Sequence, residues 1–87
     1  MANGTITFVN TSNDNWASLY IEVEEEGTQE FQDDVAPGRS SAQSTQPGDE
    51  WIVKAKKGGQ QLGSVTGTSG SQTYKILWPR GDAGTDQ

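Results

Sequence analysis

Residues 50–60, EWIVKAKKGGQ, carry the clearest structural signal in the chain. Trp51, Val53 and Ala55 occupy alternate positions, which is the two-residue period of a β-strand with one buried face. Gly58 and Gly59 follow, and a pair of glycines suits a tight hairpin turn. The segment therefore predicts a strand over residues 50–56 that returns through a hairpin into a second strand over residues 60–66.

The same alternation recurs upstream and downstream of this hairpin. Leu19, Ile21 and Val23 alternate with Tyr20 and its acidic neighbours, so we expect the aliphatic side chains to face the core and Tyr20 to lie on the wet face. Turn-forming residues separate the apolar segments, as in the cluster at residues 10–15. The complete pattern predicts seven strands, over residues 5–9, 18–24, 29–32, 40–45, 50–56, 60–66 and 72–78.

Seven short strands with a turn about every ten residues are typical of an antiparallel β-sandwich or small barrel. Apolar residues recur nowhere at helical spacing. We therefore predict an all-β fold, a small antiparallel β-sandwich. At 87 residues the chain has room for one domain, which we place at residues 1–78, followed by a polar, flexible tail over residues 79–87.

Composition excludes several function classes. The net charge of −6 disfavours nucleic acid and anionic membrane surfaces as partners. The absence of both histidine and cysteine removes the usual transition-metal ligands and the commonest catalytic bases and nucleophiles. We expect a non-catalytic protein without metal or cofactor, and a soluble chain, since no signal peptide or membrane-spanning segment is recognisable.

The order and spacing of the turn and strand markers resemble the β-domain of the von Hippel-Lindau (VHL) tumour suppressor family, over roughly residues 4–77. The similar segments are FVNTS at 8–12, LYIEV at 19–23 with Gly27 following, the aromatic Phe31, VAPG at 35–38, TQPG at 45–48 leading to WIV at 51–53, and GGQQL at 58–62. The resemblance implies a prealbumin-like β-sandwich that recognises an extended peptide or protein segment.

By position, the peptide pocket of that family corresponds here to Tyr20, Phe31, Thr45, Asp49 and Trp51, which the resemblance implies share one sheet face. Asp49 stands where the hydroxyproline-binding relative has histidine, and Phe31 lacks a phenolic hydroxyl, so specific hydroxyproline recognition is not implied. The helical domain that joins that relative to a ubiquitin ligase has no counterpart in this chain, and no ligase-adaptor role is expected.

Two other functions stay open. One is a carbohydrate-binding domain in which Trp16, Tyr20 or Trp78 stacks on sugar rings while Asn and Asp side chains bond hydroxyls. The other is a structural accessory domain of a larger protein. The default role of Trp51 is core packing. For Tyr20 the sequence favours ligand stacking and cross-strand packing about equally.

The carboxylate clusters do not predict catalysis or calcium binding. Adjacent strand residues point to opposite faces, so neither Asp33–Asp34 nor Asp49–Glu50 forms a converging pair. The glutamates between residues 22 and 26 lack the regular acidic spacing of a calcium loop. The tripeptide Arg80-Gly81-Asp82 matches an integrin motif, but three residues recur by chance and nothing else in the sequence supports an adhesive role.

Overall fold

The computed structural model describes residues 3–23, 25 and 27–78. These residues form seven strands and no helix, which confirms the predicted all-β class. The strands are β1 Gly4–Asn10, β2 Ala17–Val23, β3 Thr28–Val35, β4 Ser40–Thr45, β5 Glu50–Ala55, β6 Gln61–Thr66 and β7 Ser71–Ile76.

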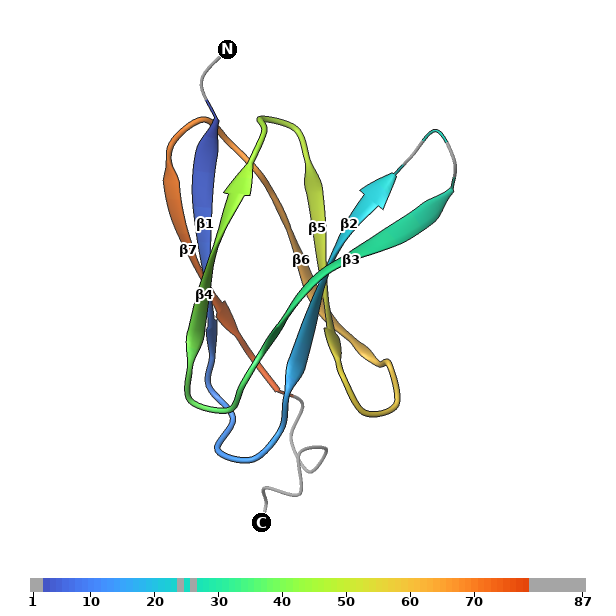
Figure 1. Ribbon diagram of the computed structural model, residues 1–87, viewed down its shortest axis with the longest axis vertical. Coiled ribbons are helices and arrows are strands. Elements are labelled where there is room, and N and C mark those ends of the chain that lie inside the picture. The colour runs from blue at the N-terminus through green and yellow to red at the C-terminus, as the bar shows by residue number, and fades with distance from the viewer. Residues whose placement is uncertain (1–2, 24, 26, 79–87) are drawn as a thin grey trace.

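Two sheets pack face to face and enclose one core (Figure 1). The three-stranded sheet has the order β4-β1-β7, and the four-stranded sheet has the order β3-β2-β5-β6. The side chains of the core cluster come from the facing sides of both sheets, as the period-two pattern predicts: Ile6, Phe8, Ala17, Leu19, Val35, Trp51, Val53 and Ile76. Ile52 is also buried, but on the outer face, opposite Tyr20. The predicted β-sandwich is therefore the observed fold.

One strand pair departs from a purely antiparallel arrangement. β7 pairs with β1 in parallel, whereas all the other neighbouring strands are antiparallel. β7 reaches the three-stranded sheet by crossing from β6 of the other sheet, so no hairpin with β1 sets its direction. As a result β7 ends beside the β1–β2 loop and the β5–β6 hairpin, at the lower end of the molecule in Figure 1.

A β-bulge divides β3 into two parts. Leu19 pairs with Asp33 and Tyr20 with Phe31, which leaves Gln32 as an extra residue. Beyond the bulge, the Asp33 carboxylate accepts hydrogen bonds from Ser41 Oγ and Gln43 Nε2 of β4, at 2.9 and 3.2 Å, and so ties the two sheets together.

The first part of β3, Thr28–Gln32, swings away from the three-stranded sheet together with β2 (Figure 1). The bulge explains why the sequence predicts a strand of only four residues here, over 29–32. The extra residue breaks the two-residue alternation on which the prediction depends.

Candidate functional site

The strand register separates the five residues that the family resemblance groups together. Tyr20 lies opposite Phe31 and Ile52, while Trp51 lies opposite Ile21. Directly paired residues share a face of a sheet, and consecutive residues do not. Tyr20 and Phe31 therefore occupy the outer face of the four-stranded sheet, and Trp51 the inner face. The expectation that all five residues share one face is wrong.

Trp51 is a core residue, as its default role predicts. It is 1% exposed, and its ring packs 5.3 Å from that of Phe8. Its indole N–H donates to Thr45 Oγ1 at 2.8 Å, and Thr45 is itself buried. Asp49 closes the β4–β5 turn by accepting the Gln46 backbone N–H at 3.0 Å. Thr45, Asp49 and Trp51 thus hold this corner of the sandwich together.

Tyr20 and Phe31 form an aromatic pair on the outer face, which we call the outer aromatic pair. Their ring centroids lie 5.8 Å apart at an interplanar angle of 71°, a favourable edge-to-face arrangement. Tyr20 is half-buried, with Lys54 Nζ 4.9 Å from its ring centroid, whereas Phe31 is 55% exposed. Cross-strand packing accounts for Tyr20, and Phe31 is the ring that this face presents to solvent.

Carboxylates lie beside the outer aromatic pair. Glu22 follows Tyr20 by two residues on the same face of β2 and pairs with Glu50 of β5. Both lie along a shallow hollow of about 270 Å³ at the end of the sheet. Its lining is Glu22, Val23, Glu25, Gly48, Asp49 and Glu50, so Asp49 is the one further member of the predicted site that approaches this surface.

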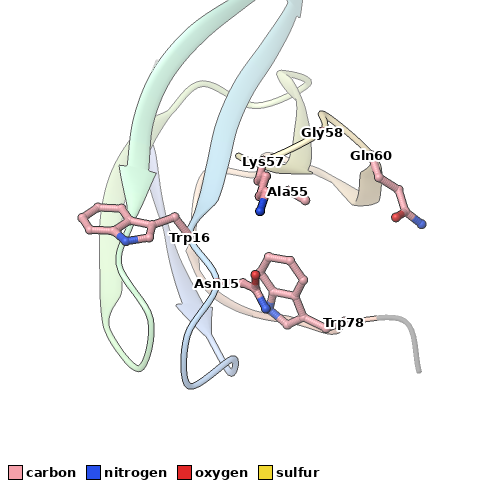
Figure 2. A pocket seen from close by; sticks show the side chains of 7 residues that line it. All are labelled: Asn15, Trp16, Ala55, Lys57, Gly58, Gln60 and Trp78. Atoms are coloured by element: carbon pink, nitrogen blue, oxygen red, sulfur yellow. The ribbon is translucent and has the colours of Figure 1, made fainter. Parts of the chain in front are cut away.

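Trp16 and Trp78 both lie at the opposite end of the molecule, which we call the tryptophan end. They line a hollow of about 250 Å³ together with Asn15, Ala55, Lys57, Gly58 and Gln60 (Figure 2). Figure 2 shows the indole of Trp78 below Lys57 and Ala55, while the ring of Trp16 points to the other side of Asn15. A second hollow, of about 400 Å³, lies against Asp14, Asn15, Trp16, Lys56 and Lys57.

The Trp16 ring is exposed, as stacking on a sugar would require, and Lys56 lies over it. Trp16 is 48% exposed, and Lys56 Nζ lies 5.4 Å from its ring centroid. The same ammonium group forms a 2.7 Å ion pair with Asp34. The hydrogen bond from Lys56 lowers the pKa of the Asp34 carboxyl, and a hydrogen bond from Ser18 and the Lys56 charge act in the same direction, while burial opposes them.

Asn10 supports the tryptophan end from the buried side. The sequence analysis missed this role because it assigned Asn10 to the loop. It is 1% exposed, and its amide nitrogen donates to the backbone oxygens of Asn15 and Val35 at 2.8 and 3.0 Å. Its amide oxygen accepts the Ser12 backbone N–H at 3.0 Å and the Trp78 indole N–H at 2.9 Å. The two-residue alternation of the strand could have revealed it, because Asn10 follows Ile6 and Phe8 at every second position and therefore faces inward with them.

The remaining carboxylates behave as strand alternation predicts. Asp33 bonds toward β4, whereas Asp34 turns to Ser18 and Lys56, so the two do not converge. Among the described residues, no three histidine, cysteine or acidic side chains gather in a way that could hold a metal ion. Glu24 and Glu26 of the acidic cluster, the tail over residues 79–87 and the Arg80-Gly81-Asp82 tripeptide lie outside the described residues.

In the part of the chain that is described, no helix has the length and apolar character needed to cross a bilayer. Comparison with known proteins does not assign the chain to a family: no family model matches it, and no curated protein is significantly similar to it.

Proposed function

We propose that this chain is a non-catalytic binding module of the kind represented by the VHL β-domain, and that it holds an extended peptide or protein segment across the outer aromatic pair. The observation that carries the proposal is the position of Phe31. It leaves more than half of a large apolar ring in solvent, at 55% exposure, on a strand at the edge of its sheet. Aromatic residues, phenylalanine among them, are enriched at protein interfaces.

The edge of β3 supplies the second element of such a site. β3 has one strand neighbour in its sheet, β2, so the outer side of its backbone is open to an added strand. Asp33 ties the later part of β3 to β4, so a peptide can add along the part that precedes the bulge, where Phe31 lies. A peptide that adds to this edge gains main-chain hydrogen bonds there and can place one side chain against Phe31.

Lys54 lies over the Tyr20 ring, but the acidic hollow next to the aromatic pair favours a basic segment. Glu22 lies two residues beyond Tyr20 on the same face and pairs with Glu50 of β5. The chain as a whole carries a net charge of −6. Alternate residues of an extended peptide point to the same side. A peptide with an apolar residue or proline over Phe31 can therefore bring a lysine or arginine two positions away to the carboxylates.

The buried position of Thr45 and Trp51 shapes the expected specificity. Thr45 Oγ1 already accepts the Trp51 indole N–H, and both residues are buried. We therefore propose that selection rests on apolar contact and charge rather than on reading a peptide hydroxyl group.

The test uses an array of extended peptides that combine proline or leucine with lysine or arginine at alternate positions. The tightest peptide is then labelled and titrated by fluorescence anisotropy against the protein and the Phe31→Ala variant. Truncating a central anchor weakens binding about tenfold or more. Phe31 lies outside the core cluster, so the variant still folds, and losing the edge-to-face contact with Tyr20 lowers its free energy of unfolding by about 0.5–1.5 kcal/mol.

The matched control is Leu77→Ala, which removes another large exposed apolar side chain, 68% exposed, from the end of β7. It leaves peptide affinity unchanged. Equal affinities for the parent and Phe31→Ala would refute the site. If no peptide of the array binds, the result would favour the structural accessory role instead.

A further inference from the structure

The tryptophan end has the composition of a sugar site and lies apart from the outer aromatic pair. Trp78, which follows β7, places its indole in the smaller hollow beside Asn15, while the ring of Trp16, from the β1–β2 loop, lies on the other side of Asn15 (Figure 2), and Trp16 also lines the larger hollow. Flat aromatic surfaces flanked by a few polar side chains are what a pyranose ring requires, since it offers C–H groups on its faces and hydroxyls around its rim.

Both indoles are oriented before any ligand arrives. Trp78 is anchored through its N–H, which donates to the buried Asn10 at 2.9 Å, so its ring surface is what remains for contact in the hollow. Trp16 carries Lys56 over its ring, and its backbone oxygen accepts the Lys56 N–H at 3.0 Å. A preformed site of this kind spends little free energy on ordering side chains when a ligand binds.

The size of the site suits a short oligosaccharide. The hollow of about 250 Å³ next to Trp78 and the hollow of about 400 Å³ next to Trp16 share Asn15, Trp16 and Lys57 in their linings. One sugar unit can therefore contact each indole, with Asn15 and Lys57 between them.

The local charge indicates the class of sugar. Among the described residues, the loops at this end carry Arg39, Lys56 and Lys57 against Asp14. The opposite end carries the acidic hollow described above. The two ends of the molecule thus differ in charge. Lys56 forms an ion pair with Asp34, and Lys57 is the lysine that lines both hollows. A carboxylate-bearing ligand complements this end of an otherwise acidic protein.

We propose that the tryptophan end binds an oligosaccharide containing uronic acid, with sugar rings against Trp78 and Trp16 and a carboxylate at Lys57. This site goes beyond the proposed peptide-binding function and uses none of its residues.

Indole N–H signals provide the test, because the chain has three tryptophans and each gives one cross-peak in a ¹⁵N-correlated NMR spectrum. Trigalacturonic acid is titrated into the labelled protein, with the neutral trisaccharide of galactose as the matched ligand. The Trp16 and Trp78 signals shift with the acidic sugar, while the signal of buried Trp51 stays in place. The neutral sugar binds more weakly, and raising the salt concentration reduces the difference.

Two lysine variants separate a specific contact from general charge. Lys57→Gln weakens binding of trigalacturonic acid about threefold, the effect of losing one exposed ion pair, without changing affinity for the neutral sugar. Lys75→Gln makes the same charge change on β7 and leaves both affinities unaltered. Trp16→Ala reduces both affinities about tenfold.

The proposal would be overturned by no shift of the Trp16 and Trp78 signals with either sugar, by equal affinity for the acidic and neutral sugars, or by an equal effect of the two lysine variants. Equivalent shifts with an acidic peptide such as tetraglutamate would show that the site reads charge without a sugar, and would also refute it. Because Phe31 lies outside this site, none of these results bears on the peptide proposal, which has its own test.

Discussion

Replacing Asn10 with leucine tests whether one buried amide holds the tryptophan end together. Leucine has the same branched shape as asparagine but carries methyl groups where Asn10 has its amide nitrogen and oxygen. Asn10→Leu therefore removes four hydrogen bonds without opening a large cavity. The groups left behind are the backbone oxygens of Asn15 and Val35, the backbone N–H of Ser12 and the indole N–H of Trp78.

The expected magnitude follows from the burial of those groups. The bonds to Val35 and Ser12 are fully buried, and each buried group that loses its partner costs about 1–3 kcal/mol. The bonds to Asn15 and Trp78 are partly buried, so water compensates for part of their loss. We expect the free energy of unfolding to fall by about 3–6 kcal/mol. A domain of this length has a total stability of about 4–13 kcal/mol, so the variant loses a large share of it.

Urea denaturation followed by circular dichroism measures this loss. The matched control is Asn13→Leu, at an exposed position of the loop that follows β1, which changes the free energy of unfolding by less than about 0.5 kcal/mol. Trp78→Phe removes one of the four bonds and costs about 1 kcal/mol, and combining it with Asn10→Leu costs less than the sum of the two single changes. A loss below about 1 kcal/mol for Asn10→Leu would refute the reasoning.

Two further predictions concern a close backbone contact and an ion pair. Gly67→Ala places a methyl group against Thr45 Oγ1 and lowers the free energy of unfolding by about 1–3 kcal/mol in urea denaturation, whereas Gly70→Ala, where a methyl group meets open space, changes it by less than about 0.5 kcal/mol; equal effects would contradict the packing at Gly67. Because Lys56 lowers the pKa of Asp34 from its ordinary 3.8, the stabilisation from this pair is complete above the unfolded-state pKa and is lost as the pH falls through the lower folded-state value. Unfolding of the parent and Asp34→Asn from pH 2 to 7 should differ by less than about 1 kcal/mol at neutral pH, because Lys56 is half exposed, and should converge in acid; a difference independent of pH would exclude the ion pair as its cause.

Much of the fold could be predicted from local pattern. The strand at residues 40–45 is observed with the predicted limits, and the alternation around Leu19 and Val53 correctly assigns both to the core. The limits of β3 could not be predicted, because a bulge interrupts its alternation at Gln32. The candidate site was less accessible to sequence reasoning: the resemblance joined Tyr20 to Trp51, although the register puts them on opposite faces.

The sequence by itself determined where the chain is extended, where it turns and which side of each strand is apolar. These properties depend on neighbours within a few residues, through backbone preference and side-chain alternation. Only the tertiary structure decided that β7 lies parallel to β1, that Asn10 is buried and that Trp16 and Trp78 lie at the same end of the molecule. Each of these depends on how two sheets close over a shared core, and that closure is a free-energy balance among segments far apart in the chain, which no local pattern contains.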